Sequence, residues 1–388
     1  MKDSRNTPTL LLVLTAVFLV VKASLAGEIG GFVINDKNPT VPDNWALCNF
    51  LEHPEIYENW DNPVIQKLSL SGRVHVDVAF FDAHEEDFNS LLWRRVRKGF
   101  AATLFEDFRV VSQVEFDLND LDPAYSRISD AYISWSKSDE FEIKVGKQAA
   151  SFTLDGATSS NSLIRPERSV LSSNLWFPEL FLSGISASGE IGNWYYNVAG
   201  FSSSINSEFG DFDGGNFGIF SIGYDYTDFV PLDKAVIRFD YVNQQEHSNN
   251  NGTRDFAQLL SLNGQFEKGP WGIWTDVAFG DGYRGQDDVF GLQLMPFYNV
   301  TDKLQLVASY NYLKGRGDNS VRFDRYESRI ESGRADEMHE FFAGVNYYFC
   351  GHKLKWQNGV EYTTAKDRAN DGGDYDGWGF TSGIRMSW

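Results

Sequence analysis

The residues best suited to binding chemistry form a basic run early in the chain. Four cations fall within five positions of the stretch WRRVRKGF at 93–100, namely Arg94, Arg95, Arg97 and Lys98. On a β-strand alternate residues share a face, so Arg95 and Arg97 would lie on one side and Arg94 and Lys98 on the other. Rings of arginine and lysine in a pore wall select anions. The alternative is a solvated basic strand end that binds nothing.

A second candidate is the polar connection 149–179, which contains ATSSNSLIRPERSVLSSN at 157–174. A connection of this length in a compact fold is usually functional. If it folds into a pore, Arg165, Glu167 and Arg168 would be the charges at the constriction. An ordinary surface loop is the alternative.

The elements that must position these residues are strands. Apolar and polar residues alternate with a period of two, which is typical of a β-strand with one apolar and one polar face. The C-terminal GWGFTSGIRMSW at 377–388 shows the pattern, with Trp378, Phe380 and Trp388 on one face and Thr381 and Arg385 on the other. We predict sixteen strands, at 67–81, 92–105, 108–118, 128–137, 140–148, 180–188, 193–201, 216–226, 234–242, 256–266, 271–280, 288–297, 302–312, 339–349, 353–364 and 376–388.

The connections between these segments alternate between long, such as 82–91 and 313–338, and short, such as 106–107. Outer-membrane barrels show this alternation, with short periplasmic turns and longer extracellular loops. A soluble sandwich or propeller has no reason to segregate its loop lengths. The mean hydropathy of −0.34 fits either class, because half of each barrel strand faces water. We therefore expect an all-β fold, a transmembrane antiparallel β-barrel of about 16 strands in which 149–179 folds inward as a constriction loop.

The N-terminus has the features of an export signal. Lys2 and Arg5 precede an apolar run at 10–21, and Ser24-Leu25-Ala26 supplies small residues for signal cleavage. The apolar run is too short for a transmembrane helix, which needs about 20 residues. We expect a signal peptide at 1–26, an N-terminal segment at 27–64 and the barrel at 65–388. The expected location is the outer membrane of a Gram-negative-type bacterium.

The segment 27–64 should contain a short helix and lie in the periplasm or the lumen, because the first strand begins on the periplasmic side. By parity the turn at Cys350 is also periplasmic. A Cys48–Cys350 disulfide would then pin the segment to the barrel floor in an oxidising compartment. Two unpaired thiols are the alternative.

Charge and motifs exclude other classes of function. The net charge of −20 makes nucleic acid an unsuitable partner. None of the six histidines stands beside a G-x-S-x-G elbow or in an H-E-x-x-H helix, so we expect no enzyme. The acidic stretches 210–215 and 371–377 lack the spacing of an EF-hand. We predict no metal site, catalytic residue or cofactor.

From about Ile65 onward the chain resembles the phosphate-selective porin O and P family, trimeric outer-membrane channels of sixteen strands. The resemblance rests on the order and spacing of several stretches: WRRVRKGF at 93–100, LFEDFRVVSQVEFDL at 104–118, SDAYISW at 129–135, IKVGKQ at 143–148, ATSS at 157–160, PERS at 166–169 and FFAGVNYYF at 341–349.

The resemblance implies an ion pathway through Arg94 and Arg95, Asp130, Lys147 and the Glu167–Arg168 pair. It also implies a homotrimer. The chain departs from the family pattern after IKVGKQ. Many relatives have further basic residues there, whereas this chain has only uncharged or acidic residues at the corresponding positions: Ala149, Ala150, Ser151, Leu154, Asp155 and Gly156.

The last strand must pair with the first, near 68–80, to abolish the sheet edges. We expect Trp388 to close the barrel at the periplasmic girdle of aromatic residues. The family resemblance suggests that the barrel-assembly machinery reads this terminal aromatic.

The sequence thus predicts an outer-membrane porin that lets small hydrophilic solutes diffuse, with a modest preference for anions such as phosphate or polyphosphate-like solutes. One alternative is a structural or adhesive barrel that does not conduct. A general or sugar porin without anion preference is another.

Overall fold

The computed structural model describes residues 46–388 except 85, 176–179, 319 and 369–371. The predicted signal peptide at 1–26 and the first part of the segment 27–64 lie outside the described residues.

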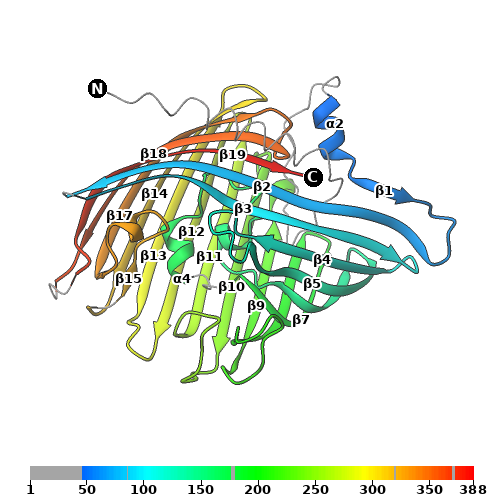
Figure 1. The fold of residues 1–388 in the computed structure, drawn as a ribbon, viewed down its shortest axis with the longest axis horizontal. Coiled ribbons are helices and arrows are strands. Elements are labelled where there is room, and N and C mark those ends of the chain that lie inside the picture. The colour runs from blue at the N-terminus through cyan, green and yellow to red at the C-terminus, as the bar shows by residue number, and fades with distance from the viewer. Residues whose placement is uncertain (1–45, 85, 176–179, 319, 369–371) are drawn as a thin grey trace.

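Sixteen antiparallel strands form a closed barrel (Figure 1). They are β2 (Ile65–Ala83), β3 (Glu86–Leu104), β4 (Phe108–Phe116), β5 (Tyr125–Ser138), β6 (Phe141–Ala149), β7 (Phe181–Ile191), β8 (Trp194–Ser202), β9 (Asn216–Asp225), β10 (Lys234–Gln244), β11 (Phe256–Lys268), β12 (Trp271–Gly282), β13 (Val289–Asn299), β14 (Leu304–Gly315), β17 (Glu337–Tyr348), β18 (Leu354–Lys366) and β19 (Tyr375–Ser387). Each predicted strand overlaps one of these, so the predicted barrel is confirmed.

Short elements complete the chain: α2 (Ala46–Glu52), β1 (Glu55–Glu58), α3 (Leu154–Ala157), α4 (Val170–Leu175), η1 (Thr227–Phe229), β15 (Val321–Arg322), η2 (Glu327–Arg329) and β16 (Arg334–Ala335). No helix in the described part of the chain combines the length and the apolarity that spanning a membrane requires.

The two faces of the wall differ as the alternation predicts. Along β12, Ile273 and Phe279 on the outer face are 38% and 40% exposed, whereas Asp276 on the inner face is fully buried. A band of exposed apolar side chains on the outside and polar side chains on the inside is the pattern of a barrel surrounded by lipid.

The sequence predicted a long loop at 82–91, and this prediction is wrong. β2 and β3 each have 19 residues and run to Ala83 and Glu86, so a tight turn joins them. His84 in this turn has a φ of 58°, in the left-handed region. The polar residues at 86–90 suggested a loop, but they continue β3 as a hairpin, paired with β2 up to Ala83–Glu86.

The connection between β6 and β7 folds into the barrel, as predicted for the constriction loop. Figure 1 shows its helix α4 (green) inside the ring of strands. Leu171 and Leu175 of α4 are fully buried and share an apolar cluster with wall residues such as Phe256 and Val289. We call 150–180 the first inward segment.

A second inward segment, 316–336, connects β14 and β17 and was predicted only as a long loop. Its Val321 and Tyr326 are buried, and the Tyr326 hydroxyl donates to Asp77 of β2 over 2.8 Å. The backbone N–H of Arg322 donates to the side chain of Asn174 in α4 over 2.7 Å. The two segments therefore pack on each other within the lumen.

The seam between β19 and β2 closes the barrel and is covered from outside by α2. Trp388 and Gly72 exchange backbone hydrogen bonds of 3.2 and 3.4 Å. A Cβ on Gly72 would lie 2.3 Å from the Trp388 ring, so only glycine fits there. Cys48 and Leu51 of α2 form one cluster with Trp388 and with outward-facing residues of β2 and β19: Val74, Val76 and Met386.

This packing corrects the expectation for Trp388. Its side chain is only 3% exposed, so the ring does not stand in a lipid-facing girdle. The reason is that α2 lies between the ring and the surroundings of the barrel. The described part of the segment 27–64 packs on the outside of the wall beside the turn at Cys350 and not in the lumen, and its predicted periplasmic placement stays a prediction.

The structure joins Cys48 of α2 to Cys350, in the turn between β17 and β18, with Cα atoms 5.2 Å apart. We predict that protein alkylated without reductant carries no label on either cysteine, and that both become labelled after reduction. Mass analysis of the two preparations checks this. Two labelled thiols in the unreduced sample would contradict the bond.

Candidate ion pathway in the barrel lumen

A β-bulge lets two adjacent arginines of β3 reach the lumen. His75 pairs with Arg95, but the next residue of β2, Val76, pairs with Trp93, so Arg94 has no opposite residue in the ladder. Such an extra residue bends the strand and re-aims its side chain. Simple alternation puts Arg94 on the same face as Lys98, where a cation would have to sit at the rim or turn inward, and the bulge turns Arg94 inward. Lys98 remains outside and exposed.

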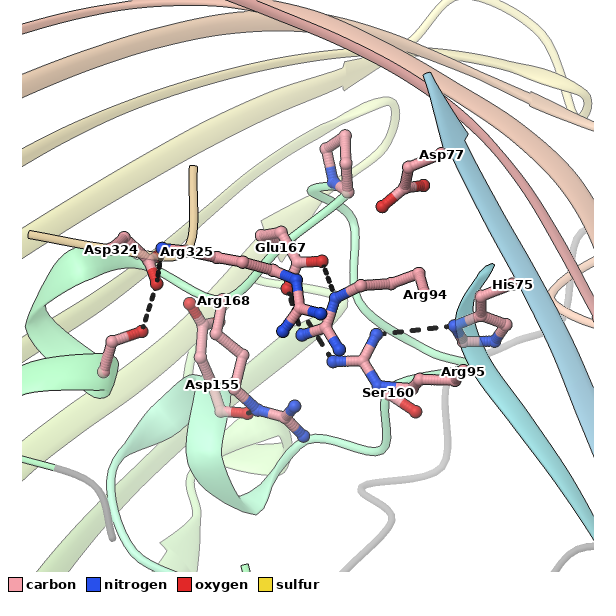
Figure 2. A network of polar contacts seen from close by, with 12 residues as sticks. His75, Asp77, Arg94, Arg95, Asp155, Ser160, Glu167, Arg168, Asp324 and Arg325 are labelled. Carbon is pink, nitrogen blue, oxygen red and sulfur yellow. Dashed lines mark hydrogen bonds and ion pairs between the residues drawn. The ribbon is translucent and has the colours of Figure 1, made fainter. Parts of the chain in front are cut away.

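The arginine pair holds Glu167 of the first inward segment (Figure 2). The Arg94 guanidinium donates to both carboxylate oxygens, with one contact of 2.7 Å from Nη2 to Oε2. Arg95 Nη2 lies 3.7 Å from the same Oε2. Burial alone would raise the pKa of Glu167, but Arg94 and Arg95 outweigh it and hold that pKa well below its usual range.

Arg165 anchors the same segment to the opposite wall. Its Nη1 donates to Glu340 of β17 over 2.6 Å and to Ser309 of β14 over 2.9 Å. The guanidinium also lies over the ring of Phe342, 4.4 Å from its centroid. Arg165 and Glu167 therefore fix the segment across the lumen, and each satisfies its charge in doing so.

Arg168 stabilises the fold of the segment itself. Its Nε donates to the backbone oxygen of Asp155 over 2.8 Å, and its Nη2 donates to that of Thr158 over 2.9 Å. These bonds link the start of the segment, near α3, to the PERS stretch that precedes α4.

A cavity of about 80 Å³ lies between the first inward segment and the wall of β2 to β6. We call it the cationic cavity, because five basic residues and one carboxylate are among its lining residues: Arg73, Arg95, Arg97, Lys144, Arg168 and Asp130. Arg97 is also paired with Glu115 over 3.1 Å. The cavity wall nevertheless keeps an excess of positive charge, which favours anions.

A second cavity of about 40 Å³ adjoins the first, because both are lined by Lys144, Gln148, Ala149 and Ser151. We call it the polar cavity. Its other lining residues are Ser186, Ser188, Asn197, Ala199, Phe201, Ser221 and Arg238. Arg238 is neutralised by Asp240, 2.9 Å away. The remaining polar groups are hydroxyls and amides.

Carboxylates gather on the far wall, where Glu327, Glu340 and Glu361 place oxygens within 4.8 Å of one another. Arg165 lies 2.6 Å from Glu340 and 3.6 Å from Glu361, so the chain supplies its own counter-cation and we assign no metal to the cluster. Burial and the neighbouring Asp324 and Glu340 raise the pKa of Glu327 above its usual range, which favours the protonated carboxyl in this cluster.

The predicted pathway residues separate into three groups. Arg95, Arg97, Asp130 and Arg168 meet at the cationic cavity. Arg94, Arg165 and Glu167 serve as anchors of the first inward segment. Lys147 lies outside both cavities, with Nζ 3.1 Å from Glu208 of the loop between β8 and β9.

The sequence analysis did not single out Arg73 or Lys144. Neither has an adjacent basic residue of the kind that marks the run at 94–98. Arg73 alternates with His75 and Asp77 on the inner face of β2. A search of the polar face of every predicted strand would have found it.

The comparisons agree with this barrel. The chain resembles an anion-selective porin from Comamonas acidovorans at 13% identity, over 83% of this chain and 99% of that chain, with a TM-score of 0.55. It resembles Salmonella typhi OmpF in complex with daunomycin at 15% identity, over 86% and 100%, with a TM-score of 0.60. A trimer form of OmpT, an outer membrane protein of Vibrio cholerae, matches at 14% identity, over 83% and 99%, with a TM-score of 0.52.

At these identities the solved structures establish the fold alone, which is that of outer-membrane porins. The comparison with curated proteins gives no match. The sequence model of the family described as phosphate-selective porin O and P matches residues 68–218, which run from within β2 to the start of β9 and include the first inward segment. The family match therefore covers less than half of the chain, and over residues 68–218 it agrees with the porin fold of the closed barrel.

Proposed function

We propose that the protein forms a water-filled diffusion channel with a modest preference for anions. The observation that carries this proposal is the cationic cavity, where five basic residues face one carboxylate beside the inward segment. Charges at a constriction act on a passing ion at short range and in a medium that screens them poorly. The acidic residues that give the chain its net charge of −20 include many in exposed loops, where salt screens them.

We also propose which solutes, membrane and partners the channel has. The solutes are small and hydrophilic, with phosphate and polyphosphate-like anions as candidates. The chain is exported by a cleaved signal peptide, inserted by the barrel-assembly machinery and surrounded by outer-membrane lipid as a homotrimer. The likeness to a porin-fold protein solved in a trimer form supports the trimer.

The reversal potential in planar bilayers tests the anion preference. With a gradient of potassium chloride across the membrane, we expect a sign that corresponds to chloride crossing more easily than potassium. A clear preference for potassium would overturn the proposal. A purified, folded barrel that gives no conductance would instead favour a structural or adhesive barrel.

A further inference from the structure

We propose that the preferred solutes are small hydroxylated molecules that carry one terminal anionic group. The anionic group would enter the cationic cavity and the hydroxylated body would enter the polar cavity. This inference rests on the proposed anion-selective channel and adds the class of substrate.

The two cavities lie side by side against the same residues. They share Lys144, Gln148, Ala149 and Ser151, all of which belong to β6 or to the start of the first inward segment. Lys144 stands at the junction, where its Nζ lies 4.8 Å from the centroid of the Tyr132 ring. A solute anion beside Lys144 would have the polar cavity directly next to it.

The two parts differ in charge. Arg73, Arg95 and Arg97 line only the cationic cavity. In the polar cavity, the charge of Arg238 is taken up by Asp240, and its Nη2 also donates to the backbone oxygen of Thr153 over 2.8 Å. Apart from Lys144 at the junction, the polar cavity therefore offers an anion no charge that is not already neutralised.

The polar cavity suits hydroxyl groups. Ser188, Asn197 and Ser221 offer hydroxyl and amide groups that can both donate and accept hydrogen bonds. Gln148 is held in place by Ser186, whose hydroxyl donates to Gln148 Oε1 over 2.7 Å. The buried ring of Phe201 adds a flat apolar surface to the same cavity. Apolar surface with a few placed polar groups is typical of small-molecule sites.

The volumes support a solute that occupies both parts. Since one water needs roughly 10–15 Å³ of such volume, the cavities of about 80 and 40 Å³ each hold more than one water. Inorganic phosphate would use only the cationic cavity. A molecule with a hydroxylated body would also displace water from the polar cavity and replace its hydrogen bonds.

Blocking of single-channel current provides the test. Glucose 6-phosphate and glucuronate carry the proposed combination of groups, whereas inorganic phosphate and glucose each lack one part. We expect glucose 6-phosphate to halve the chloride current at a concentration about tenfold below that of phosphate, because several hydrogen bonds of modest net strength are added. Tight block by glucuronate as well would show that any terminal anion suffices, and block by the phosphate ester alone would assign the site to phosphate.

Variants of the polar cavity test whether block by glucose 6-phosphate depends on that cavity. Replacing Asn197→Leu and Ser221→Val together should raise the blocking concentration of glucose 6-phosphate about tenfold, while block by phosphate and the reversal potential stay unchanged. Thr275→Val is the matched control, since it removes a hydroxyl from the outer face of β12.

The outcomes separate this inference from the proposed function. An anion-selective channel that glucose 6-phosphate and glucuronate block no better than phosphate would overturn the inference alone. A cation-selective channel would overturn both. The comparison of solutes on the unaltered protein needs no variant, so a variant that misfolds does not remove the test.

Discussion

The double variant Arg73→Gln, Lys144→Gln is expected to lose most of the anion preference of the channel. Both side chains line the cationic cavity, so the change removes two of its five positive charges. A unit charge about 4 Å from a passing ion is worth about 1 kcal/mol in water and more in a partly dry site. Two such charges should therefore lower the ratio of chloride to potassium permeability by roughly tenfold or more.

The barrel should tolerate this change. Arg73 donates to Ser160 over 2.5 Å and Lys144 lies 3.5 Å from Glu142, so both have hydrogen-bonding or charged neighbours that glutamine or water can satisfy. The reversal potential in a salt gradient gives the permeability ratio, and repeating it at high salt should shrink the difference because screening weakens the field.

Lys98→Gln is the matched control for this experiment. Lys98 is a cation of β3, one residue from Arg97, but it is exposed on the outer face of the barrel. Its removal should leave the permeability ratio unchanged. An equal fall in both variants would mean that overall charge, and not the cationic cavity, decides the selectivity.

Glu167→Gln is expected to release the first inward segment from the wall. The change leaves Arg94 and Arg95 facing a neutral amide. The contact is largely shielded from water, because the Arg94 and Glu167 side chains are each only 15% exposed. Removing one partner of a buried ion pair typically costs about 3–5 kcal/mol. We expect a lower midpoint of thermal unfolding, new protease cleavage within 150–175 and a larger, noisier single-channel conductance.

Two further variants test this explanation. Arg94→Met combined with Glu167→Met should recover part of the lost stability, because it removes the charge of Arg94 together with its partner and leaves only the longer contact of Arg95 unpaired. Glu337→Gln breaks a more exposed pair with Lys314, whose side chain is 46% exposed, and should cost at most about 1 kcal/mol. A Glu167→Gln protein with unchanged unfolding, cleavage and conductance would show that the segment is held by its apolar helix α4 instead.

The strands could be predicted from the sequence because their signals are local. Alternation along each strand and the lengths of the connections are both encoded within a few residues, and every predicted strand overlaps one in the structure. The error at 82–91 has the same origin. Polar residues indicate exposure to water, and a hairpin that extends beyond the lipid is as exposed as a loop.

The site was predicted less completely because its geometry is set by distant contacts. The bulge at Arg94 depends on how β3 pairs with β2, which alternation within β3 cannot reveal. Lys147 lies in the stretch IKVGKQ with a second lysine, but its ion-pair partner Glu208 comes from a distant loop that the stretch itself does not reveal. The position of the second inward segment is also set by a distant contact, because its Tyr326 donates a hydrogen bond to Asp77, 249 positions earlier in the chain.

The bond between α2 and the last turn has a consequence for the order of assembly. Cys48 precedes every strand of the barrel, while Cys350 follows all but the last two, and 302 positions separate them. The bond can therefore form only after nearly the whole chain has been made. Once formed, it keeps the beginning of β2 near the place where β19 arrives, which lowers the entropic cost of bringing the two ends together. Oxidation of this pair thus requires that all strands of the barrel except β18 and β19 are already present in the chain.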